Sequence, residues 1–145
     1  MQRLLLVLAV GLLVAADDTK DEAVRKDLKS LKGKWTLTSS VIDGQKTEGD
    51  DAKGEVVFTD DKYEAKMGDD TVHKGSYTID PSKSPKAMDS VPSDGDEAGK
   101  THYIIYELKD DTLKLCIATG GGERPKDFSA EAGSGRVLLI YKRAK

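Results

Sequence analysis

The stretch Leu31-Lys32-Gly33-Lys34-Trp35-Thr36-Leu37 decides the fold of this chain. It holds the only tryptophan, and it separates a segment with helical periodicity from a series of segments with alternating periodicity. Gly33 is the residue type that commonly ends a helix in a left-handed conformation. From Trp35 onward, apolar and polar residues alternate as they do in a half-buried strand. The stretch therefore predicts a helix that ends at Lys32 and a first strand that begins with Trp35.

Residues 18–32, on the N-terminal side, have the pattern of one short amphipathic helix. Val24, Leu28 and Leu31 follow the i, i+4, i+7 spacing of a single helical face. Acidic residues lie in the first turn and lysines in the last turn, where the helix dipole favours each. A helix of this length is not stable alone, so we expect its apolar face to pack on the rest of the domain.

Short alternating segments follow one another on the C-terminal side, with turn signals such as Asp43-Gly44 between them. No helical pattern lies between these segments. Such a series predicts an all-β, antiparallel up-and-down meander of about eight strands, either a barrel or a sandwich. Residues 119–135 are expected to form the longest irregular segment. The expected strands are residues 35–41, 56–58, 62–67, 71–79, 86–91, 101–108, 112–118 and 136–142.

Residues 1–16 follow the three-part plan of a secretory signal peptide. A positive charge at Arg3 precedes an apolar run over residues 4–15, and small residues precede a switch to acidic residues after Ala16. The run is shorter than the ~20 apolar residues of a membrane-spanning helix. We therefore predict cleavage after Ala16, a secreted or periplasmic location, and no membrane span in the mature chain.

The composition fits one domain with a modest core. The chain has 145 residues, of which 37% are hydrophobic and 34% are charged, and its formal net charge is −3. Both signs of charge are mixed along the chain with no basic stripe, so we expect no nucleic acid partner. A single cysteine allows no intramolecular disulfide, so an exported copy must be held together by packing.

No constellation typical of an enzyme or a metalloprotein is visible. His73 and His102 lie on different expected strands, without a third ligand at a metal-binding spacing. Ser134 lies between glycines, but the outer positions of the hydrolase elbow pattern are not glycine. Cys116 lies in an apolar strand segment, which predicts a buried, inert thiol. We therefore predict no enzymatic activity, no catalytic residues, no metal and no cofactor.

The short helix, the Gly33-x-Trp35 pair and the meander together resemble the lipocalin superfamily and its smaller lipocalin-like relatives. The resemblance extends over nearly the whole mature chain to a lipocalin-like domain family abundant in planctomycete bacteria. The most specific of the similar runs extends from Tyr106 to Cys116. The runs are Leu31–Trp35, Lys74–Thr78, Asp80–Pro85, Tyr106–Cys116, Glu123–Pro125 with Phe128, and Gly133–Gly135.

This resemblance implies a lipocalin-like barrel over residues 33–145, with residues 17–32 forming a helix packed on it. It also implies structural roles for three residues. Gly33 and Trp35 open the first strand, and the indole plugs the closed end of the barrel. A basic residue at the end of the last strand packs across that plug, with Arg143 as the candidate and Lys142 as the alternative.

The resemblance further implies a non-catalytic binding protein for a small apolar or amphipathic ligand. The alternative is a solid-core structural module, or one that binds another protein of the cell envelope. Cavity volume separates the two, because a barrel filled by aromatic residues and leucines leaves no room for cargo.

The candidate ligand-binding residues are Arg124, Phe128, Tyr77 and Tyr106. Long loops in compact domains are often functional, and barrel mouths are preferred ligand sites, so the loop over residues 119–135 is expected at one mouth. Arg124 could there meet an anionic head group, with the tyrosines near an apolar portion. The alternative is that Arg124 fixes the loop by pairing with Asp127 or Glu123.

Overall fold

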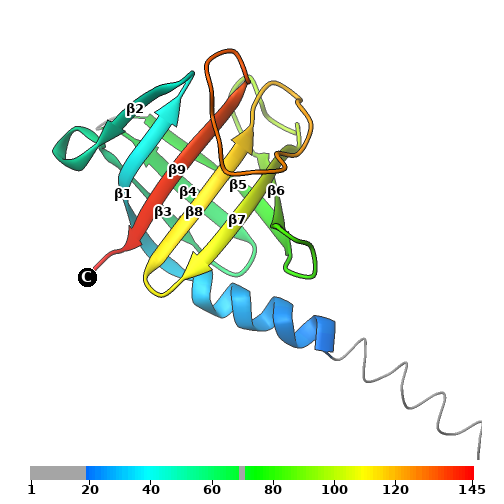
Figure 1. Ribbon diagram of the computed structural model, residues 1–145. Coiled ribbons are helices and arrows are strands. Elements are labelled where there is room, and N and C mark those ends of the chain that lie inside the picture. The colour runs from blue at the N-terminus through cyan, green and yellow to red at the C-terminus, as the bar shows by residue number, and fades with distance from the viewer. Residues whose placement is uncertain (1–18, 69–70) are drawn as a thin grey trace, which may run out of the picture.

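The computed structural model describes residues 19–68 and 71–145. Within these ranges, one helix over residues 19–31 is followed by a single antiparallel sheet (Figure 1). The predicted signal peptide, residues 1–16, lies outside the described residues. The strands are β1 (Gly33–Ile42), β2 (Gln45–Glu48), β3 (Gly54–Phe58), β4 (Lys62–Met67), β5 (Thr71–Asp80), β6 (Lys86–Pro92), β7 (His102–Lys109), β8 (Thr112–Ala118) and β9 (Arg136–Arg143), with a 3-10 turn η1 (Gly49–Asp51).

The sheet closes into a barrel because β1 also pairs with β9. The first half of β1 pairs with β3, while its second half pairs with the short strand β2. From β3 to β9, each strand is hydrogen-bonded to the next along the chain. Eight strands therefore form the closed barrel, and β2 is an added edge strand. The predicted all-β, up-and-down lipocalin-like fold is confirmed.

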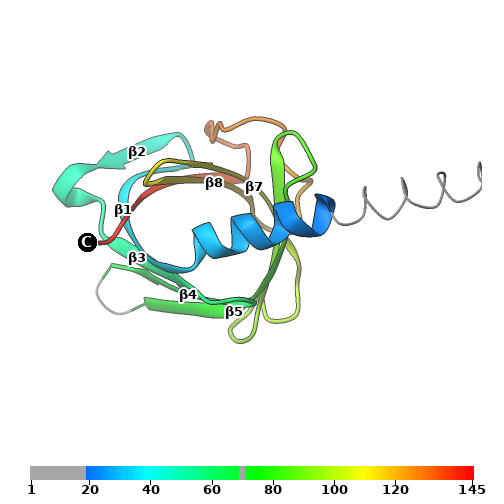
Figure 2. The ribbon, with the colours of Figure 1, turned by 90° about the horizontal axis from the view of Figure 1, so that it is seen from below.

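The helix lies across one end of the barrel, as the view from below shows (Figure 2). Leu31 is fully buried in the core, and Leu28 packs against the core from the same helical face. The chain then turns from helix to strand at Gly33, whose φ of 116° is one that L side chains rarely adopt. The apolar stripe of the helix thus closes this end of the barrel, which we call the closed end.

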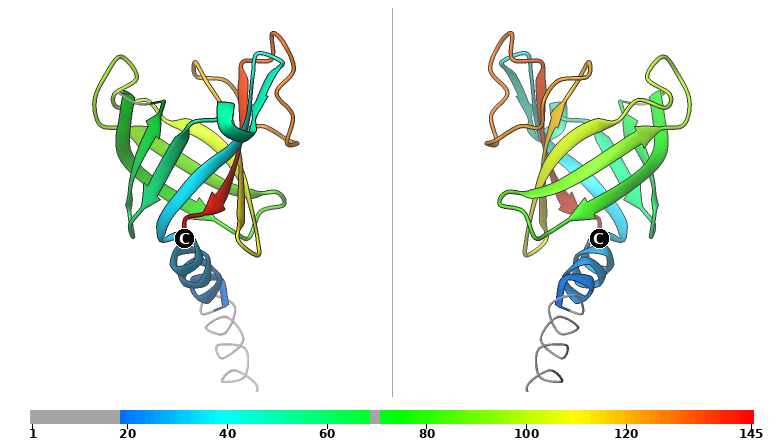
Figure 3. Two further views of the ribbon diagram at one scale, coloured as in Figure 1. Left: turned by 90° about the vertical axis from the view of Figure 1, so that its left-hand side faces the viewer. Right: turned by 90° about the vertical axis from the view of Figure 1, so that its right-hand side faces the viewer.

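The opposite end, which we call the open end, carries the long connections. Side views place the helix and the C-terminus together, with the loops that follow β6 and β8 away from them (Figure 3). The loop over residues 119–135 turns back onto the outer face of the barrel. Its residues Ala130 and Pro125 are buried, as are Ile105 and Cys116 on the outward-facing rows of the strands beneath. The Cys116 thiol donates to the carbonyl of Ser129 in this loop. The prediction of a buried Cys116 is confirmed.

Candidate functional site

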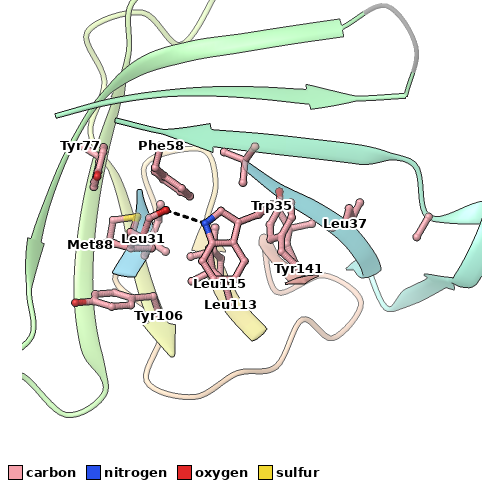
Figure 4. Packing of buried hydrophobic residues seen from close by; sticks show 14 residues of the cluster. Leu31, Trp35, Leu37, Phe58, Tyr77, Met88, Tyr106, Leu113, Leu115 and Tyr141 are labelled. Carbon is pink, nitrogen blue, oxygen red and sulfur yellow. Dashed lines mark hydrogen bonds between the residues drawn. The ribbon is translucent and has the colours of Figure 1, made fainter. Parts of the chain in front are cut away.

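Trp35 and Arg143 meet at the closed end, where they lie opposite one another in the β1–β9 register. The Trp35 side chain is fully buried, and its Nε1 donates to the carbonyl of Leu31 at 2.8 Å (Figure 4). The Arg143 guanidinium carbon lies 4.2 Å from the centroid of the indole. Arg143 also donates to the carbonyls of Lys32 and Ser30 at the end of the helix. This is the arrangement that the resemblance implies for Arg143.

A polar cluster that the sequence analysis did not identify joins the helix to the barrel. The carboxylate of Asp27, which is nearly buried, accepts from Tyr106 Oη at 2.7 Å and from Lys86 Nζ at 2.9 Å. Burial raises the pKa of Tyr106, and its hydrogen bond to the Asp27 carboxylate raises that pKa further. Asp27 lies three residues after Val24 and four before Leu31, which places it on the apolar face of the helix. An acidic residue on that face was the sequence feature that could have indicated a buried polar contact.

Tyr77 also makes contacts inside the protein near the closed end. Its hydroxyl donates to the carbonyl of Thr59 at 2.6 Å, and its ring packs edge-on against Phe58 with centroids 5.1 Å apart. Burial raises the pKa of Tyr77 to about 12, and the nearby charges of Asp60 and Asp61 act in the same direction. The hydroxyl groups of Tyr77 and Tyr106 are thus both hydrogen-bonded within the protein.

Arg124 lies outside the barrel, where it fastens the loop to β6 and β7. Its Nη1 donates to the carbonyl of Ile104 at 2.8 Å and to that of Met88 at 3.0 Å. Its Nη2 forms an ion pair with Asp89, and its guanidinium carbon lies 5.1 Å from the centroid of the Tyr103 ring. The guanidinium is therefore held by strand carbonyls, a carboxylate and an aromatic face at once.

The expected partners of Arg124 within the loop do not bind it. Asp127 pairs with Arg136 at 3.3 Å, and the partner of Arg124 is Asp89 of β6. A carboxylate fixed on a strand is pre-organised, whereas Glu123 is exposed on the loop itself. The alternative that Arg124 fixes the loop agrees with the geometry, although the partner named for it was wrong.

Phe128 lies on the same outer face as Arg124. The ammonium of Lys114 lies 5.3 Å from the centroid of its ring. Next to it, the thiol of Cys116 donates to the carbonyl of Ser129 at 3.4 Å, and burial raises the pKa of that thiol. Phe128 and Ser129 thus lie against the outward-facing side chains of β8.

The four candidate ligand-binding residues do not share one surface. Arg124 and Phe128 lie outside the barrel, whereas Tyr77 and Tyr106 are buried inside it. The loop folds along the outer wall because strand carbonyls and Asp89 offer its arginine fixed partners there. A ligand-binding role for these residues stays a prediction.

The open end presents a different inner surface from the closed end. Met67, Ile117 and Val137 face inward and pack against the core, but they are only partly buried. Val137 pairs with Ile42 at the far end of β1, and Ile117 pairs with Val137, so the register places both remote from the helix. We call Met67, Ile117 and Val137 the open-end cluster.

Small side chains accompany the open-end cluster on the inner face. Gly54 and Ala65 occupy inward positions near Met67, whereas the closed end carries large aromatic residues. Deeper in the barrel, Ser90 lies opposite Tyr77 and forms a hydrogen bond with Tyr63. Burial raises the pKa of Tyr63, and that hydrogen bond opposes the rise. Apolar side chains that are partly exposed beside small residues form the surface on which an apolar ligand could rest.

The described residues contain neither a metal-binding cluster nor a membrane-crossing helix. Among residues 19–68 and 71–145, no three His, Cys, Asp or Glu side chains group as ligands for a metal ion. Over the same ranges, no helix combines the length and the apolar content that a membrane crossing requires.

Comparison with known proteins gives one match. The lipocalin-like domain family matches residues 31–115, which include the Trp35 plug and the strands from β1 to most of β8. No curated protein and no solved structure matches the chain.

Proposed function

This chain belongs to the lipocalin-like domain family, and from that premise we propose that it is a non-catalytic binding protein for a small apolar or amphipathic ligand. The open-end cluster carries this proposal. Met67, Ile117 and Val137 are inward-facing apolar side chains that the protein itself leaves partly exposed. A ligand that covers them removes apolar surface from water, which favours binding by roughly 25 cal/mol per Å² before the cost of association.

The closed end limits how deep such a ligand can enter. Trp35, Tyr106, Tyr141 and Leu113 are fully buried and fill the interior next to the helix (Figure 4). The proposed ligand is therefore small, with its apolar part against the open-end cluster and any polar group at the rim. This site differs from the one that the sequence suggested around Arg124.

Binding of the neutral apolar dye N-phenyl-1-naphthylamine tests the proposal. We expect dye fluorescence to rise with the parent protein and to fall strongly in Ile117→Gln, which places an amide in the cluster. Val72→Gln is the matched control, because Val72 is 47% exposed and lies outside the cluster. Equal dye binding by both variants, at unchanged melting temperatures, would show that the open end is not the binding site.

A solid-core interaction module is the second candidate, and the filled interior favours it. The aromatic residues and leucines at the closed end fill the interior of the barrel there. In this case the outer surface binds a protein of the cell envelope, and no small molecule is bound. The absence of dye binding by the parent protein would support this second candidate.

We also propose that the protein is exported to a secreted or periplasmic location. Support comes from the charge, apolar run and small residues of positions 1–16. N-terminal sequencing of the mature protein should begin at Asp17 or within a residue or two of it. Intact Met1 in the cytoplasmic fraction would contradict export.

A further inference from the structure

A groove of about 430 Å³ lies on the outer face of the barrel, across β3, β4, β5 and β6. Its walls come from outward positions that alternate with core residues. Val57, for example, lies between buried Val56 and Phe58 and is itself 37% exposed. The groove is therefore separate from both the open-end cluster and the loop over residues 119–135, and its size is in the range of small-molecule sites.

Strand register places two lysines at the centre of this outer groove. Lys62 pairs with Ser76, and Lys74 lies two residues before Ser76 on β5, so the lysines are diagonal neighbours on one face. Diagonal positions are about 7–8 Å apart, which is within reach of long side chains. Both ammonium groups can therefore reach one small group bound between them.

The two lysines of the groove have no ion pair, as is the case for most lysines of the described chain. In the described part of the chain, neither Lys62 nor Lys74 has a carboxylate within ion-pair distance, whereas Lys34 and Lys86 do. Glu64 is the one acid that lines the groove, and it lies opposite Lys74 in the β4–β5 register. Two cations and one anion leave a charge of +1, which favours an anionic ligand.

Apolar side chains flank the lysines on the outer strands of the groove. Val57 of β3 lies on one side, and Val91 of β6 lies on the other. An anion with a short apolar chain matches this order, because its charge can lie over the middle strands while its chain covers a valine. We infer that the outer groove binds a small monocarboxylate with an apolar chain, held by Lys62 and Lys74 and packed on Val57 or Val91.

Titration with octanoate, followed by NMR of the backbone amides, tests this inference. We expect shifts centred on residues 57, 62–64, 74–76 and 91, and weaker binding of octanol, which lacks the charge. The double variant Lys62→Gln/Lys74→Gln should bind octanoate about fivefold more weakly, the effect of losing two exposed ion pairs. Glu64→Gln should tighten binding, because it removes the only negative charge in the lining.

Lys142→Gln is the matched control, because Lys142 is exposed on β9, across the barrel from the groove. It should bind octanoate like the parent protein. The inference is overturned if octanoate shifts only residues of the open-end cluster, or if octanol binds as well as octanoate. It is also overturned if the folded double variant retains the parent affinity.

Discussion

The guanidinium of Arg143 lies 4.2 Å from the centroid of the Trp35 indole, whose Nε1 donates to the carbonyl of Leu31. This pair joins the last strand, the first strand and the helix at one point. Because the indole is fully buried there, the closed end depends on a side chain that all three elements contact.

Replacement of that side chain should destabilise the whole domain. We expect Trp35→Ala to lower the free energy of unfolding by about 3–5 kcal/mol, as large-to-small core changes do. Val72→Ala, at an exposed position, should change it little. Urea titration followed by circular dichroism measures both. A Trp35→Ala variant as stable as the parent would show that the indole does not hold the closed end.

Arg143→Met should have a smaller effect on the same end. The variant keeps the apolar stem but loses the contact with the indole and the donors to Ser30 and Lys32 carbonyls. We expect a loss of about 1–2 kcal/mol in the free energy of unfolding. Lys142→Met, at the exposed position next to Arg143, is the control. Similar unfolding curves for the two variants would contradict the role given to Arg143.

The loop over residues 119–135 should loosen when its arginine is removed. Arg124→Ala deletes the bonds to the Ile104 and Met88 carbonyls and to Asp89. Because the loop covers Cys116, we expect the thiol to react faster with Ellman's reagent than in the folded parent. Lys126→Ala, an exposed change in the same loop, is the control. Unchanged thiol reactivity in Arg124→Ala would mean that other contacts hold the loop.

The helix and most strands could be predicted from the sequence because they rest on local signals, whereas the plug role of Trp35 came from the family resemblance. Gly33-x-Trp35 marks the change from helical to alternating periodicity, and the helix and β1 meet there. The strand β2 was not predicted, since its four polar residues carry no apolar alternation.

The partners of Arg124 and Asp27 could not be predicted from the sequence because they depend on tertiary packing. Arg124 binds Asp89, 35 positions earlier, and Asp27 binds Tyr106, 79 positions later. The outer groove was missed for a similar reason. Lys62 and Lys74 become neighbours only when the register of β4 and β5 is known.

Stability should fall at alkaline pH. Burial raises the pKa of Tyr77 to about 12 and also raises the pKa values of Tyr106 and Tyr141. In the unfolded chain these phenols titrate near their ordinary pKa of about 10. Above about pH 10 the unfolded chain therefore binds fewer protons, so the free energy of unfolding decreases as pH rises toward 12.

Parallel pH titrations of unfolding and of tyrosinate absorbance measure this effect. Tyr77 alone should contribute on the order of 2 kcal/mol across that window. Below about pH 10 these phenols are protonated in both states and should contribute no pH dependence. Tyrosinate signals of all three residues that appear while the protein is still folded would contradict their burial.

Native mass spectrometry of the protein purified from its own source tests the proposed binding function most directly. We expect an additional small-molecule mass on the parent protein that is reduced in Ile117→Gln and retained in Val72→Gln. Lys62→Gln/Lys74→Gln should also retain it, because the outer groove is a separate site. A parent protein that carries no added mass and also fails to bind the apolar dye would contradict the binding function.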